Sequence, residues 1–238
     1  FELGLKGLFL NGSLSLEAEA FSYSFEGLQV DFFNAVVWSN VTYNAGTADT
    51  EGIEFSAVWN PENIDGLTLS GSVLFLDSGY EDFVAPCYAG QRPSNGCDIF
   101  IPGSVPQQQL GGEDRLLAPD FSGYFGINYE RPIGQDLMLG STINLQFKGD
   151  HSFSEFGHPN AEQAGYELLD AGLRIGSQNG QWQLALIGKN LTEEYAVLFS
   201  RDAPSTGFGT GTEAGVLADL QTTPILGRTI ELVFTYRY

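Results

Sequence analysis

The sequence predicts an all-β fold: about nine antiparallel strands in up-and-down order that form a transmembrane β-barrel segment, an open and curved part of a larger barrel. Three observations support this prediction. Apolar and polar residues alternate along nine segments, the connections between segments alternate between short and long, and Trp and Tyr residues gather beside the short connections. The 238 residues are enough for one sizeable β domain.

The last segment shows the alternation clearly. One face carries Ile230, Leu232, Phe234, Tyr236 and Tyr238, and the residues between them, apart from Val233, are polar or charged. A period of two residues predicts a strand with one apolar and one polar face. An edge strand of a soluble sandwich would show the same pattern, so the other segments must separate the two interpretations.

Eight earlier segments follow the same period, and the connections between all nine alternate in length. The segments are 1–9, 14–20, 53–59, 67–75, 121–129, 137–148, 169–175 and 182–189. The short connections are Asn11–Gly12, Asn60–Gly66, Pro132–Asp136 and Ser177–Gln181, and the long ones are Gly27–Val41, Ser78–Pro119, His151–Ala164 and Thr192–Pro224. An up-and-down meander places every short turn at one end, as in outer-membrane barrels.

Five aromatic residues lie beside the predicted short-turn end: Trp59, Tyr129, Trp182, Tyr236 and Tyr238. We expect them to be membrane-interface aromatics, because their rings favour the hydrocarbon edge while their polar atoms favour headgroup water. The alternative is a soluble β-sandwich, either carbohydrate-binding or structural, which would gain nothing from aligning these residues at one rim.

Farther along the second segment, Phe21, Tyr23 and Phe25 change face, which indicates a β-bulge or the top of the apolar band.

Composition limits the possible partners. Ten Lys and Arg against 30 Asp and Glu give a net charge of −20, which excludes nucleic-acid binding through a basic patch. No run approaches 18 apolar residues, so no transmembrane helix is predicted. The chain starts within a strand and without a basic, apolar leader, so we expect it to be cut from a longer protein.

Few residues point to chemistry. Cys87 and Cys97 are the only cysteines and have no His nearby, so a disulfide in an exported loop is favoured over half of a metal site. His151 and His158 are expected to be solvated loop residues rather than ligands, and the acidic long loop to be solvated rather than a calcium site. We find no nucleophile–base–acid set. No enzyme activity, cofactor or metal site is therefore predicted.

Four stretches of the sequence resemble the TonB-dependent outer-membrane receptors. They are Asn44–Glu54, Trp59–Pro61 together with Leu67–Ser72, Tyr166–Gly176 and Gly188–Tyr195, the last followed by a long loop and a terminal strand ending in Tyr-Arg-Tyr. The resemblance implies a barrel of about 22 strands with a plugged lumen. It also implies uptake of a scarce ligand, a ferric siderophore or similar iron complex, energised through TonB.

On this resemblance we expect residues 1–238 to be the C-terminal part of the barrel, with the plug domain absent. The bacterial outer membrane is then the expected location. The expected partners are outer-membrane lipid and lipopolysaccharide, an imported small molecule, and the TonB complex, which would contact the missing N-terminal part.

Overall fold

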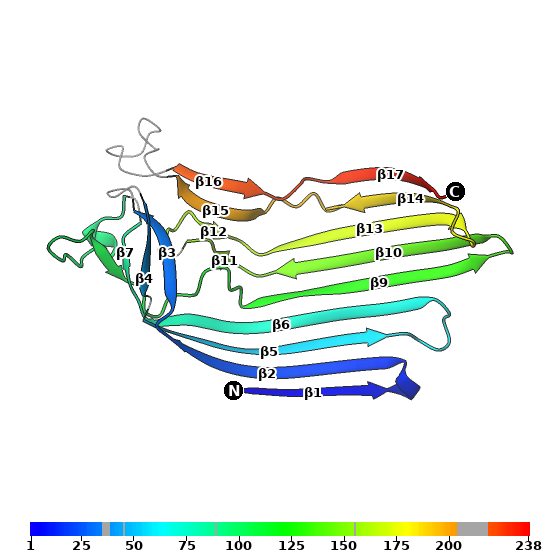
Figure 1. Ribbon diagram of the computed structural model, residues 1–238, viewed down its shortest axis with the longest axis horizontal. Coiled ribbons are helices and arrows are strands. Elements are labelled where there is room, and N and C mark those ends of the chain that lie inside the picture. Colours follow the sequence, from blue (N-terminus) through cyan, green and yellow to red (C-terminus); the bar gives the residue numbers. More distant parts are fainter. Residues whose placement is uncertain (35–38, 45, 89, 155, 204–218) are drawn as a thin grey trace.

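A computed structural model describes residues 1–34, 39–44, 46–88, 90–154, 156–203 and 219–238. Its main feature is a nine-stranded antiparallel sheet (Figure 1). Each strand of this sheet lies beside the sheet strands that come before and after it in the sequence. The strands are β1 (Glu2–Phe9), β2 (Leu14–Glu26), β5 (Thr47–Trp59), β6 (Leu67–Asp82), β9 (Phe121–Ile133), β10 (Leu137–Lys148), β13 (Tyr166–Ser177), β14 (Trp182–Lys189) and β17 (Thr229–Tyr236). The predicted antiparallel, up-and-down strand order is confirmed.

Connections of unequal length join these strands, and all the short ones lie at one end of the sheet (Figure 1). The Asn11-Gly12 turn is a short 3-10 segment, η1 (Leu10–Gly12), in which Asn11 and Gly12 both have positive φ. The four long loops comprise residues 27–46, 83–120, 149–165 and 190–228. We refer to them as the first, second, third and fourth long loops.

The strand register gives the sheet one apolar and one polar face. On β10, Leu145 pairs with Phe125 of β9 and with Leu169 of β13, whereas the preceding residue, Asn144, pairs with Gly126 and Asp170. Successive residues of a strand point to opposite faces. Paired residues share a face, so the alternation in each segment adds up to two continuous surfaces.

Five strands are longer than predicted: β2, β5, β6, β9 and β13. β2 extends to Glu26, and β6 continues to Asp82, well past the predicted start of a loop at Ser78. Backbone pairing with β5 continues along both, without a register shift between β2 and β5. A bulge at Phe21–Phe25 was therefore a wrong interpretation. The aromatics change face because the apolar band ends there.

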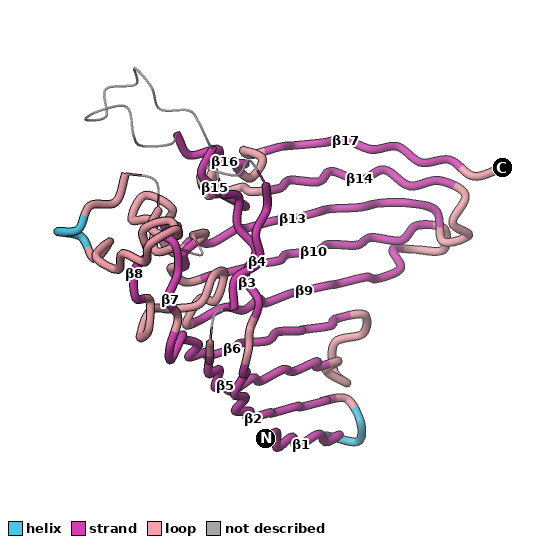
Figure 2. Tube along the Cα trace, turned by 60° about the vertical axis from the view of Figure 1, so that its left-hand side comes forward, coloured by secondary structure: helices cyan, strands magenta, loops and turns pink. Residues whose placement is uncertain are grey.

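Each long loop contains a small two-stranded sheet of its own, at the same end of the main sheet (Figure 2). The pairs are β3 (Gln29–Asn34) with β4 (Ser39–Asn44), β7 (Val84–Pro86) with β8 (Gln107–Gln109), β11 (His151–Ser152) with β12 (Glu162–Gln163), and β15 (Val197–Ala203) with β16 (Asp219–Pro224). A 3-10 turn, η2 (Pro93–Asn95), lies in the second long loop. The sequence indicated some strand only in the first of these loops.

The buried core lies at this loop end and not beneath the sheet. We call it the loop core. It consists of Ala48, Tyr80, Phe83, Ala85 and Leu110, with Leu28, Val30 and Phe156 packed against it. These residues come from the outer ends of β5 and β6 and from the first three long loops. Burial of their apolar surface therefore packs the loops together and onto the strand ends.

The apolar face of the sheet is open instead of buried. On β17, Ile230, Leu232 and Phe234 are 66%, 70% and 64% exposed. A sandwich would cover such a face with a second sheet, so the soluble-sandwich alternative was wrong. A hollow of about 920 Å³ lies on this face over β1 to β10, and smaller ones lie on the polar face. Because the sheet is twisted, both faces have hollows, and curvature alone does not tell them apart. The two faces differ in their residues, which are apolar on one face and polar on the other.

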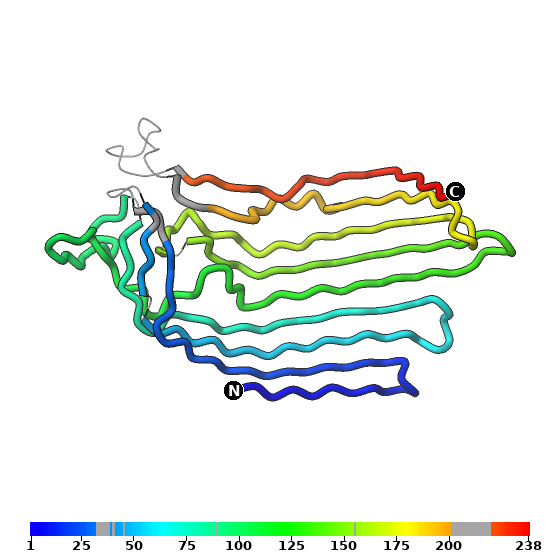
Figure 3. Tube along the Cα trace, in the orientation of Figure 1, coloured from blue at the N-terminus to red at the C-terminus, as the bar shows by residue number. Residues whose placement is uncertain are grey.

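The sheet is not closed. β1 and β17 form its opposite edges, and within the described ranges neither pairs with the other (Figure 3). Nine alternating strands make the first and last run in the same direction, so closure would need a parallel pair. In the part of the chain that the structure describes, no helix is long and apolar enough to cross a membrane.

Candidate functional site

The structure places the five predicted interface aromatics at the short-turn end. Trp59 ends β5, Trp182 begins β14, Tyr236 ends β17, Tyr129 lies near the end of β9, and Tyr238 follows β17. The four within strands share the apolar face, because Trp59 pairs with Leu14, Tyr129 with Leu67, and Trp182 with Tyr236. Their position at a lipid–water boundary remains a prediction.

A second aromatic row borders the apolar band at the loop end, and it was missed from the sequence. Phe121 lies between Phe75 and Phe147, with ring centroids 4.9 Å from each. These residues come from three neighbouring strands, β6, β9 and β10. Each is the last apolar residue on this face before a long loop, and that shared position was the signal in the sequence.

The polar face carries ion pairs between strands of the sheet. Arg174 of β13 reaches over β10 to the carboxylate of Glu130 on β9 and also lies 3.4 Å from Asn128 Oδ1. Near the other edge, Lys6 Nζ lies 3.1 Å from Glu17 Oε2. A surface of this kind needs contact with water, since exposed ion pairs stay hydrated.

Beyond the apolar band, this same face becomes aromatic. Phe21 stacks on Tyr23 with centroids 5.5 Å apart, and Phe25 follows at 6.3 Å from Tyr23. The guanidinium of Arg115, from the second long loop, lies 5.5 Å from the centroid of Phe25 and donates to Thr50 Oγ1 at 3.0 Å. The Arg115 side chain is therefore held against β2 and β5.

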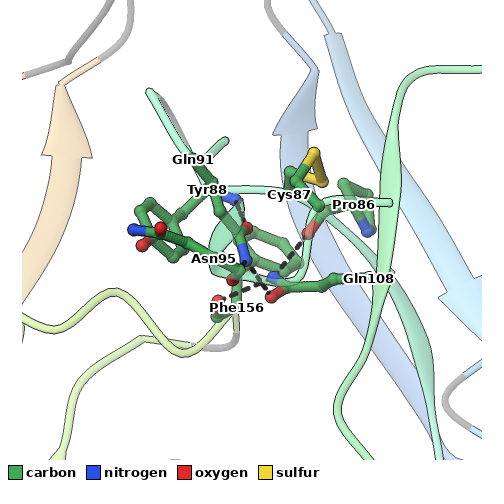
Figure 4. Close-up of a disulfide and its surroundings, with 8 residues drawn as sticks. Pro86, Cys87, Tyr88, Gln91, Asn95, Gln108 and Phe156 are labelled. Atoms are coloured by element: carbon green, nitrogen blue, oxygen red, sulfur yellow. Dashed lines mark hydrogen bonds between the residues drawn. A yellow bond between two sulfur atoms is a disulfide. The ribbon is translucent and has the colours of Figure 1, made fainter. Parts of the chain in front are cut away.

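The disulfide lies in the second long loop, where Cys87 and Cys97 are joined with their Cα atoms 5.6 Å apart. Beside it, buried Gln108 donates from Nε2 to the carbonyls of Pro86 at 3.1 Å and Phe156 at 2.8 Å (Figure 4). Its Oε1 accepts from Gln91 Nε2 at 2.6 Å. Because Phe156 belongs to the third long loop, this amide connects the two loops next to the disulfide.

Both histidines are buried, so the expectation that they are solvated was wrong. His151 and His158 are each 5% exposed. The ring of His151 lies edge-on to Phe153 at 5.0 Å, and that of His158 lies 4.8 Å from Tyr88. The sequence suggested solvation because the segment is polar, but packing between the second and third long loops buries both rings.

An acidic recess separates the second and third long loops beside the loop core. Its volume is about 280 Å³, and Tyr80 and Leu110 of the core contribute to its lining. Six ionisable side chains line it: Glu113, Asp114, Asp120, Asp150, His151 and Glu162. Among the described residues, no group of three or more His, Cys, Asp or Glu side chains has the geometry to hold a metal ion.

A family model described as TonB dependent receptor-like, beta-barrel, matches residues 1–191. None of the curated proteins compared with the sequence matches it.

Solved structures of receptors share the fold at low sequence identity. The ferric yersiniabactin uptake receptor FyuA from Yersinia pestis is 16% identical over 98% of this chain and 28% of its own, with a TM-score of 0.67. The siderophore receptor PiuA from Acinetobacter baumannii is 18% identical over 100% and 28%, with a TM-score of 0.66. The ferric-catecholate import receptor Fiu from E. coli K12 is 18% identical over 98% and 26%, with a TM-score of 0.58.

This chain thus spans less than a third of the length of those receptors, and the shared part is the strand meander with its long loops. The family model covers most of the sequence, and the structural likeness extends over nearly all of it. The chain therefore belongs to the family of TonB-dependent receptors, whose β-barrels lie in the outer membrane of bacteria, and its sheet corresponds to part of such a barrel.

Proposed function

We propose that this chain is the C-terminal sector of the barrel of an outer-membrane receptor that takes up a ferric siderophore or a similar iron complex, and that it is not an enzyme. The observation that carries the proposal is the match of the whole nine-stranded sheet and its loops to receptors named for ferric siderophores. Ligand specificity would then come from the loop end, where the strands extend beyond the apolar band.

The two faces of the sheet support this orientation. The exposed apolar face, bordered by Phe75, Phe121 and Phe147 at one end and by Trp59 and three other ring residues at the other, suits the hydrocarbon of the outer membrane. Above the band, the same face carries Glu51 opposite Asp77, where lipopolysaccharide headgroups would lie. The face with Arg174 and Glu130 suits a wet lumen.

The remaining expected partner is the TonB complex, which would energise uptake. TonB-dependent receptors interact with TonB, and in this proposal the contact is made by a plug region outside residues 1–238. The loop core would hold the first three long loops in a fixed arrangement around the ligand entrance. A fixed entrance lowers the entropy cost of ligand binding.

Uptake in living cells tests the proposal. A strain lacking the gene is compared with the same strain carrying the gene on a plasmid, both grown with little iron. Cells receive radioactive iron complexed by the siderophores that the parent strain secretes. We expect uptake only in the complemented strain and loss of uptake with a protonophore. Equal uptake in both strains, or uptake of iron that resists the protonophore, would contradict the proposal.

A further inference from the structure

We propose that the large hollow on the apolar face of the sheet binds the acyl chains of a glycerophospholipid from the periplasmic leaflet of the outer membrane, with the lipid phosphate at Arg131. This inference rests on the proposed function, because only a chain within the membrane meets such a lipid. The hollow, which we call the apolar hollow, has a volume of about 920 Å³ and extends over β1, β2, β5, β6, β9 and β10. It is as large as an ordinary ligand pocket of about 300–1,000 Å³.

Small residues form the floor of the apolar hollow. Ala57 of β5 pairs with Leu16 of β2 and with Gly71 of β6, so two small residues lie side by side on the apolar face. In the next row towards the long loops, Ala18 of β2 pairs with Phe55 of β5. Ala and Gly rise little above the backbone, so the surface is lower here than over the large apolar residues around it.

Aromatic rings form the walls of the apolar hollow, and they decide what can hold a lipid there. Lipid tails are as apolar as the protein face, so no hydrophobic gain draws a tail out of the surrounding lipid. What remains is contact between atoms, and an unfilled space loses those contacts outright. A chain in the hollow would touch the floor below it and rings at its sides. The rings belong to Phe9, Phe55, Trp59, Phe125 and Phe147.

The position of the apolar hollow along the strands indicates the leaflet. On β5, Trp59, Ala57 and Phe55 line the hollow, whereas Ile53, the next residue on this face, does not. Ile53 pairs with Phe75, which belongs to the aromatic row at the loop end of the apolar band. The hollow therefore lies between that row and the short-turn rim. Short turns of outer-membrane barrels are periplasmic, so the chains of a periplasmic-leaflet lipid reach the hollow.

Charge at the same rim favours a lipid with a phosphate. Within the described ranges, Arg131 is the one positive side chain on the apolar face at the short-turn end. It pairs with Leu139 and lies two residues beyond Tyr129. Its side chain is exposed and forms no ion pair among the described residues. Arg174 and Arg237, the other cations nearby, line a recess on the polar face.

Arg131 lies within reach of a head group whose chains occupy the apolar hollow. Leu69, which lines the hollow, pairs with Ile127 on the strand that carries Arg131. Four residues of an extended strand separate Ile127 from Arg131, a span of about 13 Å. The long Arg side chain and the glycerol backbone of the lipid together cover such a span. A guanidinium group can donate two parallel hydrogen bonds to one phosphate.

The test uses the full-length receptor, purified in detergent and freed of its lipids, with dioleoylphosphatidylethanolamine as the probe. Native mass spectrometry measures the fraction of receptor that carries one lipid as the lipid concentration rises. We expect one phospholipid to bind ahead of any further ones. Dioleoylglycerol has the same chains without a phosphate and should bind about fivefold more weakly or less.

Two variants test the two parts of the proposal. Ala18→Leu/Ala57→Leu fills the floor of the apolar hollow and should weaken phospholipid binding by about fivefold or more. Both positions are partly exposed on the apolar face, where Leu is favoured in a membrane, so this variant should fold. Arg131→Gln should weaken binding of the phospholipid several-fold and leave binding of dioleoylglycerol unchanged.

The matched control is Ala20→Leu/Ala171→Leu, which makes the same exchange on the same face at two positions that do not line the apolar hollow. Its affinity for the phospholipid should stay within about twofold of the unaltered receptor. Equal weakening in both double variants would show an effect of added bulk anywhere on the face and overturn the site. So would unchanged binding in Ala18→Leu/Ala57→Leu or in Arg131→Gln.

Other occupants of the apolar hollow would appear in the same spectra. Tighter binding of lipid A than of the phospholipid would assign the hollow to the outer leaflet, and a receptor dimer that only Ala18→Leu/Ala57→Leu lacks would assign it to a second copy. Either result would overturn the proposal. Iron uptake separates it from the proposed function. Protonophore-sensitive uptake without phospholipid binding would fail only the hollow, and phospholipid binding without uptake would fail only the proposed function.

Discussion

A single asparagine attaches the fourth long loop to the sheet. Buried Asn190 follows β14, and its side chain donates to the carbonyls of Glu194 at 2.8 Å and Leu226 at 3.1 Å while accepting from the Glu194 N–H at 2.8 Å. Its own N–H donates to Asp170 Oδ1 at 2.8 Å. Since Leu226 comes just before β17, one residue connects both ends of the loop.

Replacing Asn190 with Ala should lower the free energy of unfolding by about 2–4 kcal/mol, because three side-chain hydrogen bonds are lost in a buried position. Asn190 has a φ of 48°, a region that costs Ala strain and Gly none. Asn190→Gly should therefore be less destabilising than Asn190→Ala by about 1 kcal/mol. Urea titration in micelles measures both. Equal stability of the two variants would show that the backbone is not strained there.

His151 gives the loop end a pH dependence. Burial lowers its pKa in the folded state below the value of about 6.5 expected when unfolded, so the unfolded state binds more protons between these two values. Stability of the third long loop is thus complete above about pH 6.5 and falls as the pH decreases through the lowered pKa. The Phe153 N–H, which donates to Ala161 O at 2.8 Å, reports this in hydrogen exchange.

We expect the protection factor of the Phe153 amide to decrease between pH 7 and pH 5 in the unaltered chain and to stay flat in His151→Gln. A decrease of the same size in the variant would assign the effect to carboxylates instead. Sequence alone could not predict this behaviour. It depends on burial of a ring by two loops that are separate in the sequence, and no local pattern around His151 encodes that contact.

Among the strands, β10 gives the clearest test of the two faces. Leu145 lies in the apolar face between Phe125 and Leu169, and the neighbouring Gln146 lies in the polar one. Leu145→Arg should cost about 2–4 kcal/mol if this position is near the middle of the membrane, whereas Gln146→Arg should cost less than about 0.5 kcal/mol. Folding into lipid vesicles at increasing urea concentrations measures the difference. Similar costs for both would contradict the lipid-facing assignment.

The second long loop depends on its disulfide. Closing a ring between Cys87 and Cys97 restricts the unfolded loop, and the double replacement with Ala should destabilise it by about 2–3 kcal/mol. Chymotryptic cleavage after Tyr88, within the ring, should become faster in this variant and equally fast in the reduced parent. Cleavage at unchanged rates would show that the Gln108 hydrogen bonds hold the loop without the disulfide.

For the molecule as a whole, the parts that were predictable are those set by local pattern. Alternation fixed the nine strands and their faces, since a shift by one residue would exchange the faces, and Asn11-Gly12 marked a hairpin. The extension of β6 to Asp82, the two-stranded sheets in the loops and the acidic recess were not predictable. Each depends on contacts between segments, such as Gly79 with Asp114 or Phe156 with the loop core, that periodicity does not record.

The open sheet makes a final prediction about its two edges. In lipid, each backbone N–H and C=O must be hydrogen-bonded within the protein, yet β1 and β17 each have one edge without a partner among the described residues. In the 238-residue chain in micelles, the amides along those edges should exchange quickly, while amides between β9, β10 and β13 exchange slowly. In the full-length receptor, neighbouring strands should pair with both edges and slow them. Slow exchange at β1 and β17 in the short chain would instead show that its edges already pair, either with each other or with a second copy.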